Sequence, residues 1–223
     1  MFFDVTHLVS MLPDIWKAFL ETMLMIGISL GVAIIIGLPL GIILFTTDKG
    51  LFWENKWIKG ILGFIVNMIR SIPFIILLVA LFPLADLIVH TRIGPLAASV
   101  SLSVAAIPFF ARLVENSLRE IDKGVIEASI AVGARPWMII REVLLPEAKS
   151  SVVQAITLTI ISLVAYSAMA GVVGGGGIGD LAIRFGYYRY DETIMISTVG
   201  ILIIIVQVIQ QVGDLIAKAI DKR

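Results

Sequence analysis

The sequence predicts an all-α membrane protein, a single domain over residues 1–223 with five transmembrane helices. Hydrophobic residues make up 59% of the chain and charged residues 15%, and the mean hydropathy of +1.02 is too high for a soluble domain. The charged residues are also unevenly spread, because each of five long runs contains at most one charged residue. In lipid each backbone polar group needs a partner within its own segment, so every run is expected to be a helix.

The charge-poor runs locate the spans. A membrane helix needs about 20 mostly apolar residues. On this basis the expected spans cover about 18–46, 60–86, 93–116, 150–172 and 193–215. The stretch before the first span is expected to lie along the membrane interface.

The first span contains two glycine pairs at i, i+4 spacing, Gly27 with Gly31 and Gly37 with Gly41. Such pairs permit close helix approach, although glycine is also common in membrane helices without that role. Pro39 is expected to bend this span near its inner end, because proline removes a helical hydrogen bond.

A charged, amphipathic segment over 122–146 separates the third span from the fourth. Just before it, charge pairs such as Glu115–Arg119 would extend the third span into the cytosol. Gly133 is placed to end a first short helix that begins after the segment's Asp cap. Pro136 suits the first turn of a second helix, which Leu145-Pro146 is expected to stop. Such a helix pair is typical of a docking site for another protein. The alternative is an ordinary cytoplasmic helix pair with no docking role.

The spacing within this segment resembles the signature of ABC-importer permease subunits: Glu-Ala-Ala, three residues, Gly, nine residues, then Ile, any residue, Leu and Pro. Five positions are identical here, while Ser replaces the second Ala and Val replaces the Ile. The resemblance implies a type I ABC importer permease fold, in which this cytoplasmic coupling-helix pair between spans 3 and 4 docks into a groove on a separate ATPase subunit. The candidate coupling residues are Glu127, Ala128, Ser129, Gly133, Ala134, Val143, Leu145 and Pro146.

The distribution of basic residues favours the same placement. If 122–146 is cytoplasmic, twelve of the seventeen basic residues lie on that side, including Lys218, Lys222 and Arg223 in a C-terminal tail, while four lie outside. Cytoplasmic loops of membrane proteins carry an excess of Lys and Arg. The sequence therefore predicts an outside N-terminus and a cytoplasmic C-terminus.

Two spans carry polar residues that suggest a pathway. A charge at membrane depth, such as Arg70, costs roughly 2.5–3.5 kcal/mol on insertion scales unless it faces water or a partner. Arg70 is either a structural pin that bonds a loop or the carbonyls freed by Pro73, or a pathway residue that meets a substrate carboxylate. In the fourth span, hydroxyl groups want a neighbouring helix or a wet cavity, and the methionine there is either a gap-filler or a ligand contact. The candidate pathway residues are Asn67, Arg70, Ser71, Pro73, Tyr166, Ser167 and Met169.

Several functions are disfavoured by what the sequence lacks. It has no cysteine and two isolated histidines, so no metal site is expected. It has no Gly-x-x-x-x-Gly-Lys-Ser/Thr loop, so it is not the ATPase, and it contains no catalytic set. Balanced charge gives no field to attract nucleic acid. The run Gly174–Gly179 matches a dinucleotide fingerprint but follows a membrane helix rather than a strand, so a flexible or tightly turned external loop is expected.

A second resemblance narrows the family. RSIPF at Arg70–Phe74, YSAM at Tyr166–Met169 and the glycine-rich segment with its following tyrosines are similar to methionine-importer permeases, and the similarity covers nearly the whole chain. It implies a bacterial cytoplasmic membrane protein, not an enzyme and without a cofactor of its own. Two permease copies, surrounded by lipid, pair with two ATPase subunits that bind ATP and Mg²⁺. A lipid-anchored or periplasmic-type binding protein delivers L- and D-methionine.

Some alternatives stay open at this point. The same class of permease imports other small amino acids or sulfur compounds, and a stand-alone channel or interaction subunit would also span the membrane. Five spans do not easily enclose a pathway, so a homodimer is expected. The aromatic and basic stretch Arg184–Tyr190 is either a membrane-interface belt or part of the seat for a delivering protein.

Overall fold

The computed structural model describes residues 4–221, which form helices joined by short turns. Within these residues, four helices are long and apolar enough to cross a membrane, and a bent pair supplies a fifth crossing if its two parts count as one. The all-helical fold class is thus confirmed. Lys222 and Arg223, which the orientation argument uses, lie outside the described residues.

The helical elements in chain order are α1 (Val5–Val32), η1 (Ala33–Gly37), α2 (Leu38–Thr46), α3 (Lys56–Ser71), α4 (Phe74–Ala80), α5 (Phe82–Val89), α6 (Pro95–Arg119), α7 (Lys123–Ala131), α8 (Pro136–Met138), η2 (Ile139–Leu144), α9 (Leu145–Glu147), α10 (Lys149–Gly171), α11 (Gly177–Leu181), η3 (Ala182–Tyr187) and α12 (Glu192–Ile220). The η elements are wider, π-helical stretches that continue the helix before them. The expected third, fourth and fifth spans fall on α6, α10 and α12.

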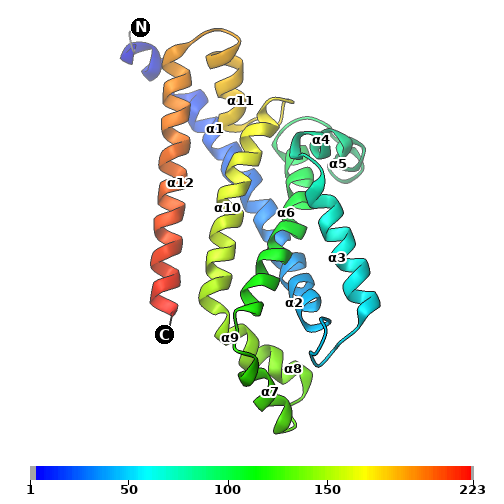
Figure 1. Cartoon of the computed structure of the whole chain (residues 1–223). Coiled ribbons are helices and arrows are strands. Elements are labelled where there is room, and N and C mark those ends of the chain that lie inside the picture. Colours follow the sequence, from blue (N-terminus) through cyan, green and yellow to red (C-terminus); the bar gives the residue numbers. More distant parts are fainter. Residues whose placement is uncertain (1–3, 222–223) are drawn as a thin grey trace.

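Helix α6 lies at the centre of the bundle. It packs most extensively against α1, α2 and α10, and it also contacts α3, α4 and α5. Figure 1 shows α12 and α3 at opposite edges, with α4, α5 and α11 toward one end and α7, α8 and α9 at the other. The N-terminus lies at the first end and the C-terminus toward the second, where the Ser150 hydroxyl donates to the Ala217 carbonyl at 3.1 Å.

The first span is longer than the sequence predicts. Helix α1 begins at Val5 because the Asp4 carboxylate accepts from the backbone N–H groups of Thr6 (2.9 Å) and His7 (3.1 Å) and caps the helix. With η1 and α2 it forms a continuous span of 41 residues, Thr6–Thr46. At about 1.5 Å per residue this far exceeds the roughly 30 Å hydrocarbon thickness. The stretch expected along the membrane interface is therefore part of this helix, and α1 contacts α11 and α12.

The two glycine pairs of the first span differ in their surroundings. A Cβ atom added to Gly41 would lie 2.6 Å from the Ala111 carbonyl oxygen of α6, and Gly37 approaches α6 similarly. At Gly27 and Gly31 such an atom would meet nothing within 4 Å. The second pair, not the first, lets two helices of this chain approach closely.

Wide turns precede two prolines that lie inside helices. Stretch η1 contains Ile35, four residues before Pro39, and η2 contains Glu142, four residues before Pro146. A proline ring clashes with the carbonyl at that distance in an α-helix and removes one N–H donor, and the extra residue of a π turn gives the ring room. Pro39 therefore leaves the first span continuous. Leu145-Pro146 does not stop the second coupling helix, because helical structure continues to Glu147.

The second span is broken rather than continuous over 60–86. Helices α3 and α4 meet at an angle of 101°, and α5 follows α4. A proline disfavours helical conformation in the residue before it, and Ile72, which precedes Pro73, is extended with φ −81° and ψ 126°. The kink expected from Pro73 is a sharp corner that divides the span into separate helices.

Substituting Gly41 by Ala is expected to destabilise the folded chain, because the added methyl group would meet the α6 backbone, and overpacking typically costs about 1–3 kcal/mol. Gly27→Ala is the matched control, since the same methyl group there meets nothing within 4 Å. Thermal unfolding of the purified variants in one detergent compares them. Equal melting temperatures would contradict the close contact between α2 and α6.

Candidate translocation cavity and coupling segment

A cavity of about 360 Å³ lies where α3 breaks into α4. Its lining residues come from three parts of the chain: Ile69, Arg70, Ile72, Pro73, Phe74 and Leu77 from the break, Ala105 and Phe109 from α6, and Tyr166 and Met169 from α10. Four candidate pathway residues that are far apart in the sequence, Arg70, Pro73, Tyr166 and Met169, are thus brought to one cavity.

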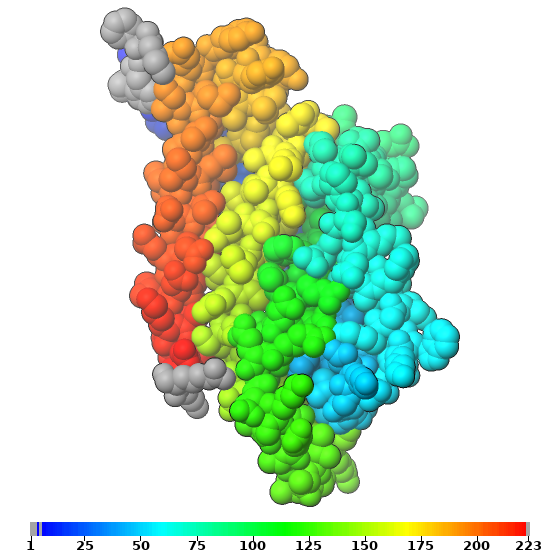
Figure 2. Space-filling view, viewed as in Figure 1, coloured from blue at the N-terminus to red at the C-terminus, as the bar shows by residue number. Residues whose placement is uncertain are grey.

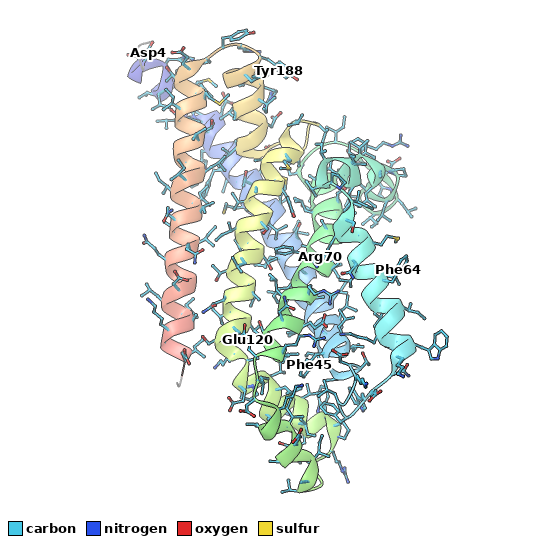
Figure 3. All side chains as sticks on the ribbon, in the orientation of Figure 1. Asp4, Phe45, Phe64, Arg70, Glu120 and Tyr188 are labelled. Atoms are coloured by element: carbon cyan, nitrogen blue, oxygen red, sulfur yellow. The ribbon has the colours of Figure 1, made fainter. Side chains whose placement is uncertain are left out.

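Arg70 stands on the cavity wall. Within the residues that the structure describes, its guanidinium forms no hydrogen bond or ion pair. The Ile69 carbonyl, which Pro73 deprives of its helical donor, instead accepts from the Ile72 N–H at 3.2 Å. Figure 3 shows Arg70 on the side of α3 that faces the bundle, whereas Phe64 lies on the outer side. The pin alternative therefore finds no bond among residues 4–221.

Helix α10 contributes an aromatic ring and a thioether. Tyr166 stacks on Phe74 with ring centroids 4.5 Å apart and an interplanar angle of 15°, and Met169 lies one turn further along the same face. Ser167 points elsewhere, because its buried hydroxyl donates to the Val164 carbonyl at 2.8 Å. The i, i+3 spacing explains why Tyr166 and Met169 share the cavity while Ser167 does not.

The other two candidate pathway residues do not line the cavity either. The Asn67 Oδ1 atom accepts from Arg112 Nη2 at 2.7 Å. The Ser71 hydroxyl donates to the Asn67 backbone carbonyl at 2.8 Å. Both side chains thus have partners inside the chain, and Asn67 connects α3 to α6.

The coupling segment, residues 122–146, has the turn at Gly133 and the cap at Asp122 that the sequence predicts. Gly133 has a left-handed conformation with φ +78°, which favours glycine. Its N–H donates to the Ile130 carbonyl at 2.9 Å and the Ala134 N–H donates to the Ser129 carbonyl at 3.1 Å, so the last carbonyls of α7 are satisfied. Asp122 caps the start of α7 by accepting from the N–H two residues later at 2.7 Å.

One side of this segment is buried and the other is exposed. Ile126, Ile139, Ile140 and Leu144 enter the main core, with Val143 and Leu145 packed against it. Glu127, Ala128 and Pro146 are exposed. Exposed apolar side chains, here called the coupling surface, are Val125 (41%), Ile130 (44%), Val132 (83%), Trp137 (67%) and Met138 (53%). Figure 2 shows the segment projecting beyond the rest of the molecule. Exposed apolar patches of this kind mark interaction sites.

An ion cluster around the buried Glu115 joins α3 to α6, and sequence reasoning misses it. The carboxylate of Glu115, fully buried on α6, accepts from Lys59 at 2.5 Å, Arg112 at 2.6 Å and Arg119 at 2.9 Å. The expected Glu115–Arg119 pair exists, but at the centre of this cluster. Arginines three residues before and four after the same Glu were the local signal; nothing local indicates that Lys59 joins them.

Asp48, in the turn after α2, extends the cluster. It pairs with Arg119 and lies 3.5 Å from Lys59 Nζ. Burial alone would raise the pKa of the Asp48 carboxyl, but the Lys49 N–H at 2.9 Å, the Arg119 guanidinium and the Lys59 ammonium hold that pKa below its ordinary value.

The glycine-rich turn after α10 is tight and fixed to α1. The Gly177 N–H donates to Glu21 Oε2 at 2.8 Å, and the Ile178 N–H donates to Thr22 Oγ1 at 2.9 Å. Gly177 has φ +81°, and a Cβ atom there would lie 2.6 Å from Thr22 Oγ1. Of the two expected forms of this loop, the structure has the tightly turned one.

These features define a class of protein: a multi-pass helical membrane subunit with a cavity among its helices and a projecting helical elbow. Residues 33–223 match the model of the family described as binding-protein-dependent transport system inner membrane component, and the chain belongs to this family. It is therefore a subunit of a transport system.

Relatives and solved structures agree with this assignment. The chain is 50% identical over 203 residues to a probable D-methionine transport system permease protein, MetI, of Vibrio cholerae, with 91% of this chain and 90% of that protein covered. It is 44% identical over 212 residues to the methionine import system permease protein MetP of Bacillus subtilis, covering 95% and 96%. It matches a chain of an inward-facing MetNI methionine ABC transporter with a TM-score of 0.94 and 46% identity, covering 96% and 99%. An amino acid ABC transporter with a TM-score of 0.81 and 18% identity shares the fold.

Asp48 makes stability depend on pH with a defined sign. Because the folded state lowers the pKa of this carboxyl, its contribution is complete above the unfolded value near 3.8 and is lost as pH falls through the lower folded pKa. The native chain is expected to melt at a higher temperature than Asp48→Asn at pH 7, with the gap closing below about pH 4. Thermal unfolding in detergent at stepped pH measures it, with Asp14→Asn, at an exposed site on α1, as control. A gap that stays constant down to pH 3 would contradict the role of Asp48.

Proposed function

We propose that this chain is the membrane-spanning permease subunit of an ATP-driven ABC importer that carries L- and D-methionine across the bacterial cytoplasmic membrane. The observation that carries the proposal is the cavity at the α3–α4 break, where Arg70, an aromatic stack and Met169 meet. A guanidinium pairs with a carboxylate through charge-assisted hydrogen bonds, and aromatic and thioether side chains suit a thioether substrate. The names of the relatives support the same substrate.

The ATP-driven step belongs to a partner. We infer that an ATPase subunit, which binds ATP and Mg²⁺, receives the coupling segment in a groove, with Val132 and Trp137 as its most exposed apolar contacts. The signature residues Glu127 to Pro146 then set the shape of the docked elbow, and Gly133 provides its turn. The likeness to a chain of the MetNI transporter supports this partnership, and the permease itself needs no cofactor.

The remaining assembly follows from geometry and charge. The α7–α9 end and the C-terminus of α12 lie on one side of the molecule, and the excess of basic residues favours the cytoplasm for that side. The N-terminus then lies outside, where a lipid-anchored or periplasmic-type binding protein delivers substrate. A second copy of the chain completes the pathway, and the exposed apolar faces of α3 and α12 contact lipid.

Chain connectivity supplies a mechanism for coupling. ATP binding closes the ATPase pair and displaces the docked segment. Helix α7 follows α6 after a short turn, and α9 is separated from α10 by Ala148 alone. Both α6 and α10 line the cavity, so displacement of the segment reaches both walls and opens the pathway outward.

Placing a carboxylate on the coupling surface is expected to abolish binding of the ATPase. Val132→Asp puts a charge into a contact that becomes buried, and an unpaired buried charge at an interface costs roughly 2–5 kcal/mol. Val172→Asp is the matched control, because this valine is also exposed (53%) but follows α10 at the opposite end. Co-purification of the ATPase with each variant measures the effect. Retention of the ATPase by Val132→Asp would contradict the docking site.

Removing the Arg70 charge is expected to slow transport strongly while assembly stays normal. A charge-assisted hydrogen bond contributes about 1.5–3 kcal/mol, so methionine uptake by Arg70→Met should fall at least about tenfold, since 1.4 kcal/mol is a factor of ten. Arg92→Met, at an exposed pair with Asp86, is the control. The assay is uptake of labelled methionine by proteoliposomes. If the Arg70→Met complex does not assemble, the result would instead support Arg70 as a structural pin. Competition of labelled methionine uptake by other amino acids tests which substrate is carried.

A further inference from the structure

Helix α3 carries part of the cavity wall but has little apolar attachment to the bundle. Among its 16 residues only Val66 is buried, in a small cluster with Leu44 and Ala111. Its outer face is exposed, with Trp57 and Phe64 at 81% and 68%. Apolar packing of this size leaves a helix free to slide or tilt, so its position depends on other contacts.

Polar ties provide those contacts, and they lie on the same face as Val66. Val66 and Asn67 lie seven and eight residues after Lys59, a spacing that returns to one side of a helix. Lys59 Nζ donates to the Leu44 carbonyl at 2.8 Å and to Glu115 at 2.5 Å. Asn67 accepts from Arg112, which itself binds Glu115 at 2.6 Å. Both ties of α3 therefore converge on Glu115.

The same carboxylate is connected to the coupling segment. Glu115 also accepts from Arg119, the last residue of α6, three residues before the Asp122 cap of α7. Arg119 binds Asp48 in the turn between α2 and α3. A cavity of about 280 Å³ is lined by residues of this turn, of the end of α6 and of α7, among them Asp48, Arg119 and Glu127.

We infer that Glu115 is a positioning residue that makes α3 follow the coupling segment, so that displacement of α7 reaches the Arg70 end of α3. The inference rests on the proposed function. Charged hydrogen bonds are directional, whereas apolar contacts permit sliding. While Glu115 holds cations from both helices, α3 and the end of α6 move together. Without its charge, α3 retains the small Val66 contact and no longer follows.

The test uses complexes of permease variants with their ATPase subunits in proteoliposomes. Glu115→Gln keeps the side-chain shape and removes the charge. Glu120→Gln is the matched control, because Glu120 accepts from Ser151 on α10 instead of joining the cluster. We expect Glu115→Gln to retain complex assembly and ATP hydrolysis near native levels. Substrate transported per ATP is expected to fall roughly five- to tenfold, within the range of coupling between sites.

A second measurement follows the cavity wall directly and needs no substrate. The chain has no cysteine, so Ile72→Cys places a single thiol in this chain on the cavity wall at the end of α3. Its maleimide labelling is expected to change when a non-hydrolysable ATP analogue is added. In the Glu115→Gln background that change should shrink by roughly five- to tenfold, and in the Glu120→Gln background it should persist.

Two results would overturn the inference. One is an assembled Glu115→Gln complex whose ATP hydrolysis falls in parallel with transport, because the ratio of transport to hydrolysis would then be unchanged. The other is a Glu115→Gln variant that matches Glu120→Gln in both measurements. If Glu115→Gln does not assemble, Lys59→Met decides, since it leaves Glu115 with both arginines, and Lys56→Met controls for loss of a lysine. If the native complex transports no methionine, the proposed function fails, while thiol labelling still decides the role of Glu115.

Discussion

Backbone polar groups that lipid cannot satisfy constrain every place where a membrane helix bends. At the corner between α3 and α4, the Pro73 carbonyl accepts from the N–H groups of Ile76 at 2.9 Å and Leu77 at 3.0 Å, so helical hydrogen bonding resumes directly after the corner. At the turn after α10, side chains of α1 accept from the first N–H groups of α11. The fold can therefore depart from straight spans at these two places, and the first of them opens the cavity.

Charges within the bundle obey a related constraint. A buried ion loses several kcal/mol of hydration unless partners replace it. Glu115 has three cationic partners and no exposed surface, which is a closed arrangement. Arg70 is the opposite case, since its guanidinium has no partner among the described residues and lies at a cavity. The first pattern is that of a structural connection, and the second is that of a group that remains available to a ligand.

Local signals in the sequence predict much of the fold. The features that these signals do not predict depend mainly on contacts between segments that are far apart in the sequence. Charge-free runs locate α6, α10 and α12, and the spacing around Gly133 predicts the elbow, because these features depend on neighbouring residues alone. The sequence does not predict the start of α1, because polar residues near its beginning are typical of an interfacial stretch, yet Asp4 caps a helix there. The sequence predicts Asn67 as a pathway residue but does not reveal its hydrogen bond to Arg112, because that partner is 45 positions away. Lys59 and Glu115, 56 positions apart, are hidden from local patterns for the same reason.

The corner and the cluster lie at opposite ends of one helix. Lys59 stands near the start of α3 and Arg70 near its end, eleven residues or about 16 Å apart. An α-helix transmits displacement along its axis because its backbone hydrogen bonds hold its length, whereas the extended Ile72 at the corner can change direction with little loss of bonding. Movement applied to the first turns of α3 is thus delivered to the cavity wall at the corner. A continuous span over 60–86 would have spread the same movement into α4 and α5, so the break at Pro73 both shapes the cavity and confines the response to it.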